Sequence, residues 1–126
     1  MHTGMKIFIT LAAICNLFSI SSATIGSASF FEHHTSTACF GDASQGPDVV
    51  AVSPAVFNAK DVCGKQMGVT CVGGAKCKST KKIMVKIVNV CPPDICPRDD
   101  DISLSKEAFT KIADINAEEV QVDVTF

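Results

Sequence analysis

The sequence has no tryptophan and no tyrosine among its 126 residues. A sugar cleft built on stacked indole rings is therefore excluded, and only phenylalanine could take that role. The chain also lacks an excess of positive charge, because 11 Lys and Arg residues face 13 Asp and Glu residues. Proteins that bind nucleic acids normally carry a strong basic excess, so we expect no nucleic-acid partner. Hydrophobic residues make up 47% and charged residues 19%, which indicates a folded domain rather than a disordered chain.

The sequence also lacks an apolar stretch of the roughly 20 residues that a membrane-spanning helix needs. The longest apolar run, residues 7–20, follows Lys6 and precedes three small residues at positions 21–23. This order is typical of a secretory signal peptide. It predicts a signal peptide over residues 1–23, cleaved after Ala23, and one domain over residues 24–126. We expect an exported protein whose mature chain does not span a membrane.

Seven cysteines are present, and one of them, Cys15, lies in the predicted signal peptide. An even set in a short exported chain indicates three disulfides, and spacing alone leaves 15 possible connectivities. The six remaining cysteines are Cys39, Cys63, Cys71, Cys77, Cys91 and Cys96. A metal site is disfavoured, because there is no paired C-x-x-C and only His33 and His34 remain after cleavage. We expect these two histidines in an exposed loop, and we expect no metal and no cofactor.

Apolar periodicity predicts a mainly β domain. The clearest strand is the last, where alternation with polar residues puts four apolar side chains on one face: Val120, Val122, Val124 and Phe126. Further strands are expected at residues 25–31, 67–72 and 82–90, with a short apolar run at 48–52. Helical spacing of apolar residues predicts a short helix over residues 105–113, and a helical turn is expected from Ser53 and Pro54. Short strands with one small helix suggest a compact β-barrel.

Several stretches match one known family in both order and spacing. They include S-T-A-C-F-G at 36–41, V-A-V-S-P-A-V-F-N at 50–58, V-C-G-K at 62–65, V-K-I-V-N-V-C-P at 85–92 and I-S-L-S-K-E-A-F at 102–109. The chain resembles the plant natriuretic peptides, also called EG45-like domain-containing proteins, which are relatives of the first domain of expansins. The resemblance implies a six-stranded double-psi β-barrel with short helices, located in the apoplast or cell wall. It also implies the disulfides Cys39–Cys63, Cys71–Cys77 and Cys91–Cys96.

Glycosidases related to this fold need two carboxylates that flank the sugar bond. By resemblance, Glu32 stands at the position of the base, after Phe30 and Phe31. Ser103 stands at the position of the acid, and a hydroxyl with a pKa far above neutral cannot serve as a general acid. Asn89 also replaces an aspartate of the family. We therefore predict a degenerate cleft at Glu32, Asn89 and Ser103, no catalytic residue and no enzymatic activity.

Charged residues gather in two further segments. Asp101 lies two residues before Ser103, which in a strand is about 7 Å away and too far to replace the acid. We expect the acidic residues of 94–101 to form a solvated loop. Five lysines and no acid occur in residues 71–86. They are interpreted either as a solvated loop or as a basic hairpin that contacts anionic pectin or an acidic receptor surface.

The resemblance also implies a function and a segment that carries it. The active segment of the natriuretic peptides corresponds to residues 36–71 here and includes Asp42, Gly46, Ser53, Pro54, Phe57, Asn58 and Gly64. We expect a monomeric, non-enzymatic secreted signal in water and solute homeostasis that binds a membrane receptor. One alternative is a module that binds cell-wall polysaccharide as expansins do. A second alternative is a barwin-like protein of plant defence or a mimic secreted by a pathogen.

Overall fold

A computed structural model describes residues 24–32, 36–59 and 61–126. The predicted signal peptide and the pair His33 and His34 lie outside the described residues. The elements along the described chain are β1 (Thr24–Phe31), β2 (Val49–Val52), α2 (Pro54–Ala59), β3 (Gln66–Cys71), η1 (Gly74–Lys76), β4 (Ile83–Val90), β5 (Ile102–Ser105), α3 (Lys106–Ile112), η2 (Ile115–Ala117) and β6 (Val120–Thr125). Within this part of the chain, no helix is long and apolar enough to cross a bilayer.

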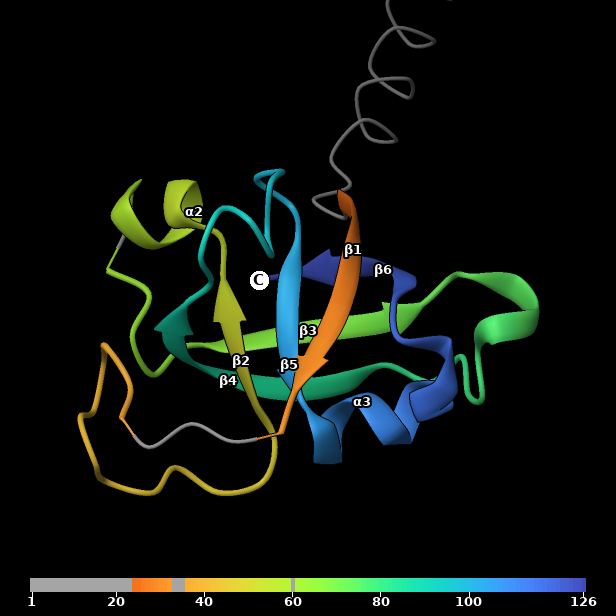
Figure 1. Cartoon of the computed structure of the whole chain (residues 1–126), viewed down its shortest axis with the longest axis horizontal. Coiled ribbons are helices and arrows are strands. Elements are labelled where there is room, and N and C mark those ends of the chain that lie inside the picture. The colour runs from red at the N-terminus through yellow and green to blue at the C-terminus, as the bar shows by residue number, and fades with distance from the viewer. Residues whose placement is uncertain (1–23, 33–35, 60) are drawn as a thin grey trace, which may run out of the picture.

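The six strands close into a barrel in the order β1-β5-β2-β4-β3-β6. The pairs β1–β5 and β2–β4 are parallel, and the other four pairs are antiparallel. In Figure 1, β2, β5 and β1 run side by side across β3 and β4, with α2 near one end of these strands and α3 near the other. The expectation of a mainly β, six-stranded barrel with short helices and three disulfides is confirmed.

The core explains why these segments become strands. Apolar side chains from all six strands pack together in one buried cluster, which includes Ala28, Val50, Val52, Met67, Val69, Val85, Ile87, Leu104, Val122 and Val124. Alternation in β6 is as predicted for Val120, Val122 and Val124, which are buried, while Gln121 is exposed. Phe126 departs from the prediction: β6 ends at Thr125, and the Phe126 side chain is 64% exposed.

Helix α3 covers the barrel near β1, β5 and β4. Its buried residues are Ala108, Phe109 and Ile112, and the Phe109 ring lies 5.0 Å from the ring of Phe30. Ser105 caps the helix, because its Oγ accepts a hydrogen bond from the Ala108 N–H at 3.2 Å. An N-cap serine satisfies one of the free N–H groups of the first turn, which explains why the helix begins directly after β5.

One disulfide joins two loops, and the other two close short loops that follow β3 and β4. Cys39 pairs with Cys63, Cys71 with Cys77 and Cys91 with Cys96. This is the pairing that the resemblance implies. The first bond joins loops that precede β2 and β3 and spans 24 residues, whereas the other two close loops of six and five residues.

Candidate functional site

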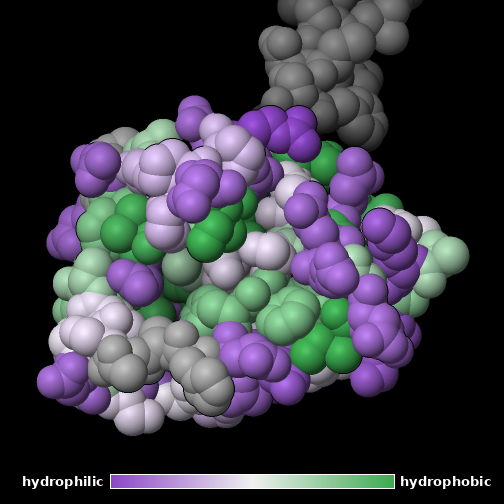
Figure 2. Space-filling model, in the orientation of Figure 1, coloured by the Kyte–Doolittle hydropathy of each residue, from purple (hydrophilic) through white to green (hydrophobic). Residues whose placement is uncertain are grey.

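The outer face of the barrel carries a row of small and polar residues across four neighbouring strands. The register pairs Asn89 of β4 with Ala51 of β2, Ala51 with Ser103 of β5, and Ser103 with Ser29 of β1. Because Ala51 is small, the surface is hollow between Asn89 and Ser103. Figure 2 shows this face, where apolar and weakly polar residues lie across the middle and hydrophilic residues border them.

The hollow has a volume of about 150 Å³ and is mostly apolar. Its lining residues are Phe31, Ala51, Val88, Asn89, Val90, Cys91, Pro92, Ile95 and Ser103. One wall of the hollow is the loop closed by the disulfide Cys91–Cys96. Both cysteines pack against Ala51. Ile95 projects from this loop with 53% of its side chain exposed, which gives the hollow an apolar rim.

Two of the three residues of the predicted cleft meet in this hollow. Ser103 is 6% exposed and lies in the floor. Asn89 accepts a hydrogen bond at its Oδ1 from the Ala38 N–H at 2.9 Å, and the Cys39 N–H donates to the Val88 carbonyl at 3.1 Å. Asn89 therefore has a structural role, because it attaches the segment before the first disulfide to the barrel.

Glu32 is not brought to the same place. It lies three residues beyond Ser29, the partner of Ser103, which is about 10 Å further along the chain of β1. Its Oε1 pairs with the Lys106 Nζ at 3.1 Å, and both side chains are about half exposed. Among the described residues, no carboxylate lines the hollow, so it has no group that could act as a general acid at Ser103.

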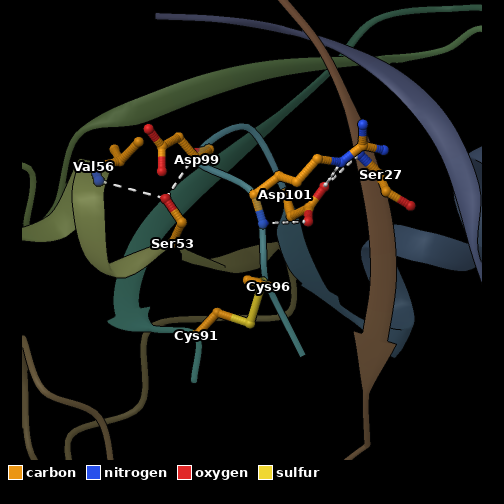
Figure 3. Close-up of a disulfide and its surroundings, with 8 residues drawn as sticks. Ser27, Ser53, Val56, Cys91, Cys96, Asp99 and Asp101 are labelled. Carbon is orange, nitrogen blue, oxygen red and sulfur yellow. Dashed lines mark hydrogen bonds and ion pairs between the residues drawn. A yellow bond between two sulfur atoms is a disulfide. The ribbon is translucent and has the colours of Figure 1, made fainter. Parts of the chain in front are cut away.

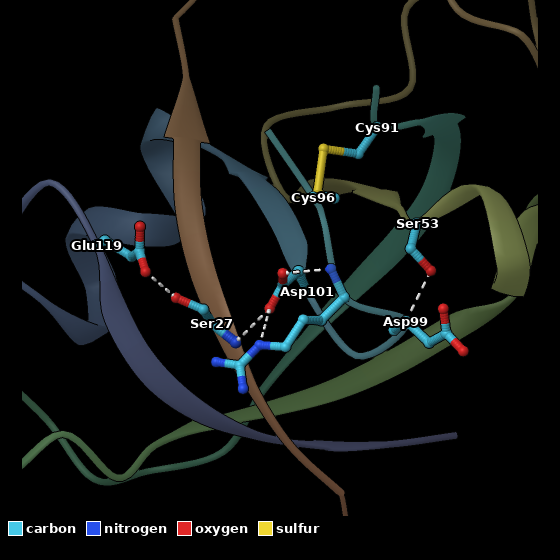
Figure 4. Close-up of polar contacts among 8 residues, drawn as sticks. Ser27, Ser53, Cys91, Cys96, Asp99, Asp101 and Glu119 are labelled. Atoms are coloured by element: carbon cyan, nitrogen blue, oxygen red, sulfur yellow. Dashed lines mark hydrogen bonds and ion pairs between the residues drawn. A yellow bond between two sulfur atoms is a disulfide. The ribbon is translucent and has the colours of Figure 1, made fainter. Parts of the chain in front are cut away.

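A second hollow of about 220 Å³ shares Ile95 with the first and is polar. It is lined by Ser27, Ser29, Asp94, Ile95, Pro97, Arg98, Asp101 and Glu119. Asp101 accepts hydrogen bonds from the Ser27 N–H at 3.2 Å and the Arg98 N–H at 2.9 Å. Figure 4 shows Asp101 directed toward Ser27, whose hydroxyl contacts Glu119 on the other side.

The prediction of a solvated acidic loop is therefore wrong for Asp101, which is only 4% exposed. Two backbone N–H groups and the Arg98 guanidinium, with its Nε 4.0 Å from Asp101, replace water around the carboxylate. Asp94, Asp99 and Asp100 are exposed as expected. No sequence pattern signals this arrangement, because the Ser27 N–H belongs to the backbone and lies 74 residues away in the chain.

The candidate signalling segment contains residues that shape the fold and residues whose side chains are exposed without such a role. Ser53 donates its hydroxyl to the Asp99 carbonyl at 2.7 Å and accepts from the Val56 N–H, so it joins α2 to the acidic loop (Figure 3). Pro54 begins α2 as predicted for the helical turn, and Phe57 packs on the core. Gly46 and Gly64 have positive φ angles of 89° and 83°. Only Asp42 and Asn58 among the seven are exposed side chains without such a folding role.

The strand order, the two parallel pairs and the hollow at Asn89 and Ser103 define a double-psi β-barrel domain. Residues 49–124 match the model of a family described as lytic transglycolase. The chain is 34% identical over 131 residues to an EG45-like domain containing protein of Citrus jambhiri, covering 98% of this chain and 97% of that relative. It is 33% identical to a putative EG45-like domain containing protein 1 of Arabidopsis thaliana, covering 85% and 86%. The chain belongs to the EG45-like domain-containing family of double-psi β-barrel proteins.

Solved structures show the same fold. The expansin of Clavibacter michiganensis superposes with a TM-score of 0.65 at 24% identity, over 82% of this chain and 49% of the expansin. This chain thus spans about half the length of that protein. A point mutant of the same expansin, solved in complex with cellohexaose, superposes with a TM-score of 0.64 at 23% identity, with the same coverage.

Proposed function

We propose that this chain is a secreted, non-enzymatic protein of the natriuretic-peptide type that acts outside the cell in water and solute homeostasis. One observation carries the non-enzymatic part: the floor of the hollow holds the hydroxyl of Ser103, and none of its lining residues is a carboxylate. Glycoside hydrolysis needs an acid and a second carboxylate on opposite sides of the bond. With Glu32 engaged by Lys106 outside the hollow, neither requirement is met there.

The extracellular part rests on the predicted signal peptide and on the three disulfides. Disulfides persist in oxidising compartments outside the cytosol, and small exported domains use them in place of a larger core. Three bonds in a domain of about 100 residues therefore support an extracellular location.

The proposed receptor contact lies on the exposed side chains of residues 36–71. Ser53, Pro54, Phe57, Gly46 and Gly64 shape this segment through capping, packing and turns, so their loss would act through folding. Asp42 and Asn58 are the two of the seven candidate residues that have exposed side chains and no such role, so we assign the receptor contact to them. An aspartate and an asparagine together offer carboxylate and amide groups for charge-assisted hydrogen bonds.

A volume assay on plant protoplasts tests this proposal directly. Purified mature protein is expected to change protoplast volume, and Asp42→Ala/Asn58→Ala is expected to abolish the change. The matched control is Glu107→Ala/Asn116→Ala, which removes one exposed acid and one exposed amide outside the segment. Both variants keep the barrel, which is checked by thermal unfolding. No volume response to the unmodified protein, or equal loss in both double variants, would contradict the proposal.

A second candidate function is the binding of cell-wall polysaccharide in the hollow. The row Asn89–Ala51–Ser103, flanked by Phe31 and Ile95, offers hydrogen-bonding groups beside apolar walls, which is the usual composition of a ligand site. The expansin solved with cellohexaose has the same fold, which makes this candidate compatible with the comparison.

Depletion of the mature protein by insoluble cellulose or xylan tests this candidate. If the hollow binds glycan, depletion persists at moderate salt, because apolar and neutral polar contacts are not screened. Ser103→Leu fills the floor and is expected to abolish depletion, whereas Ser44→Leu, on an exposed loop, is the matched control. Absence of depletion leaves the receptor-binding function as the better supported one.

A further inference from the structure

The connection between β3 and β4 forms a strongly basic surface, which we call the basic hairpin and define as residues 71–86. Its lysines are Lys76, Lys78, Lys81, Lys82 and Lys86, and it contains no acidic residue. In Figure 1 the connection projects on the right, away from α2 on the left. Lys82 precedes the first residue of β4 and Asn89 lies near its last, so Lys82 and the hollow at Ser103 are about 20 Å apart along the strand.

The basic hairpin is fixed to the barrel at several points. The disulfide Cys71–Cys77 closes it, and Cys77 forms a bridge with Ala113 at the end of α3. The Lys78 and Ser79 N–H groups both donate to the Ile112 carbonyl, at 2.7 and 3.3 Å. A surface that is already ordered loses less conformational entropy when it binds a ligand, so this anchoring favours binding.

Three of the lysines are available for a partner. Lys76, Lys81 and Lys82 are exposed, and no ion pair within the described part of the chain involves them. Lys106 and Lys111 differ, because they pair with Glu32 at 3.1 Å and with Asp48 at 2.6 Å. The aliphatic part of Lys82 lies over Gly68, where a Cβ would come within 3.0 Å of its Cδ. This contact places the aliphatic end of the Lys82 side chain over β3.

A third hollow adjoins the basic hairpin. It has a volume of about 480 Å³ and is lined by Ser27, Gly73, Lys76, Glu119, Val120 and Gln121. Gly73 packs closely against β6, because a Cβ added at this position would lie 3.4 Å from the Gln121 backbone nitrogen. The absence of a side chain at Gly73 therefore keeps the hollow open. Around this opening, the Lys76 ammonium can bind a carboxylate. The Gln121 amide and the Glu119 carboxylate, which already accepts a hydrogen bond from the Ser27 hydroxyl, can bind neighbouring ring hydroxyl groups.

We propose that the basic hairpin and this third hollow bind an acidic polysaccharide with repeating carboxylates, of the polygalacturonate type. Uronic-acid residues combine a carboxylate with ring hydroxyls, which suits Lys76 and Gln121 in the hollow, while the next carboxylates along the chain reach Lys81 and Lys82. A lipid surface is too flat to enter the hollow, and an acidic peptide lacks the hydroxyls. The site is separate from the hollow at Ser103 and from Asp42 and Asn58, so it goes beyond the proposed function.

Binding of the mature protein to soluble polygalacturonate tests the proposal. Lys76→Gln/Lys81→Gln/Lys82→Gln is expected to weaken binding about ten-fold or more, since each exposed contact contributes modestly and three are lost. The matched control Lys65→Gln/Lys106→Gln/Lys111→Gln removes the same charge elsewhere and is expected to change affinity less than about three-fold. Raising salt from about 0.01 M to about 0.15 M shortens the Debye length from about 30 to about 8 Å, which is expected to weaken binding of the unmodified protein strongly.

Two further measurements separate sugar recognition from charge alone. Fully methyl-esterified polygalacturonate keeps the sugar and loses the charge, so it is expected not to bind. Gln121→Leu is expected to weaken polygalacturonate binding and to leave binding of polyglutamate unchanged, because only the sugar uses the hollow. Ser44→Leu, a change on an exposed loop outside the hairpin, is expected to have no effect.

Three results would overturn the proposal. Equal weakening by the two triple variants would mean that net charge, not the hairpin, determines binding. Equal or tighter binding of polyglutamate or of phosphatidylserine vesicles would assign the hairpin to an acidic protein or a membrane instead. No binding of polygalacturonate at about 0.01 M salt would remove the site altogether.

Discussion

Gly26 shows how one missing side chain positions the polar hollow. A Cβ at this position would lie 1.9 Å from the Asp100 carbonyl oxygen, far inside van der Waals contact. The acidic loop can therefore lie against β1 only because residue 26 is glycine. This close approach brings the Asp101 carboxylate to the Ser27 N–H and orders the loop that carries Ile95, Arg98 and Asp101 around the two hollows.

We predict that Gly26→Ala destabilises the domain by about 1–3 kcal/mol, because overpacking forces the backbone of the loop away from β1. Chemical unfolding of the mature domain measures this change. The matched control is Gly73→Ala, whose Cβ would have its nearest neighbour at 3.4 Å, and which is expected to change stability by less than about 0.5 kcal/mol. Equal stability of Gly26→Ala and the unmodified protein would mean that the loop does not rest on β1 in solution.

Some strands of the barrel can be predicted from the sequence, and others cannot. The alternation of Val120, Val122 and Val124 predicts β6, because one face of that strand is buried and the other faces solvent. The same reasoning misses β5. Its sequence Ile-Ser-Leu-Ser alternates, but it is only four residues long, and Leu104 also fits the helical spacing of the residues that follow. Resemblance supplied what periodicity could not, namely the closed strand order.

The candidate site was predictable only in part for the same physical reason. Asn89 and Ser103 are 14 residues apart in the sequence, and they meet because Ala51 of a third strand pairs with both. The family motifs locate these two residues. No motif locates the Ile95 rim or the Asp101 contacts, since these depend on how a loop folds over the barrel.

The three disulfides act on elements of different length, so their removal is expected to have unequal effects. In the chain-entropy description, a bond that closes a longer loop restricts the unfolded chain more. Cys39→Ser/Cys63→Ser opens a loop of 24 residues and is expected to cost about 3.5 kcal/mol. Cys91→Ser/Cys96→Ser opens a loop of five residues and is expected to cost about 2 kcal/mol.

Chemical unfolding of the two double variants, made in a chain of residues 24–126 that omits Cys15, measures this difference. An unchanged unfolding midpoint for Cys39→Ser/Cys63→Ser would contradict the pairing of these residues. A larger cost for the short loop would instead show that the Cys91–Cys96 loop is needed to cover Ala51, with which its sulfurs pack.

At the scale of the whole molecule, the barrel brings three surfaces to different places. The hollow at Asn89 and Ser103 lies at one end of β4, and the basic hairpin lies at the other. Asp42 lies on the loop before β2, and Asn58 lies in α2. The central barrel is common to binding proteins and to glycosidases of this fold. Activity is therefore decided by which side chains the strands present, not by the barrel itself.

Restoring the missing acid tests this conclusion. We predict that Asn89→Asp/Ser103→Asp produces no hydrolysis of cellulose or xylan above background. The variant restores both altered carboxylates, but Glu32, which stands at the position of the base, still lies outside the hollow. The backbone places Glu32 about 10 Å along the chain from the level of Ser103, and its side chain pairs with Lys106. Release of reducing sugars measures activity, and far-UV circular dichroism confirms that the variant is folded.

A further variant tests whether the ion pair with Lys106 is what prevents Glu32 from acting as a base. Adding Lys106→Gln to the double variant frees Glu32 from its ion pair without altering the barrel. We expect this triple variant to show no hydrolysis either. The backbone of β1, rather than Lys106, sets the distance between Glu32 and the level of Ser103. Turnover by the double variant would show that the cleft of the glycosidases survives here, and turnover by the triple variant alone would show that the Lys106–Glu32 pair is what keeps the barrel inactive.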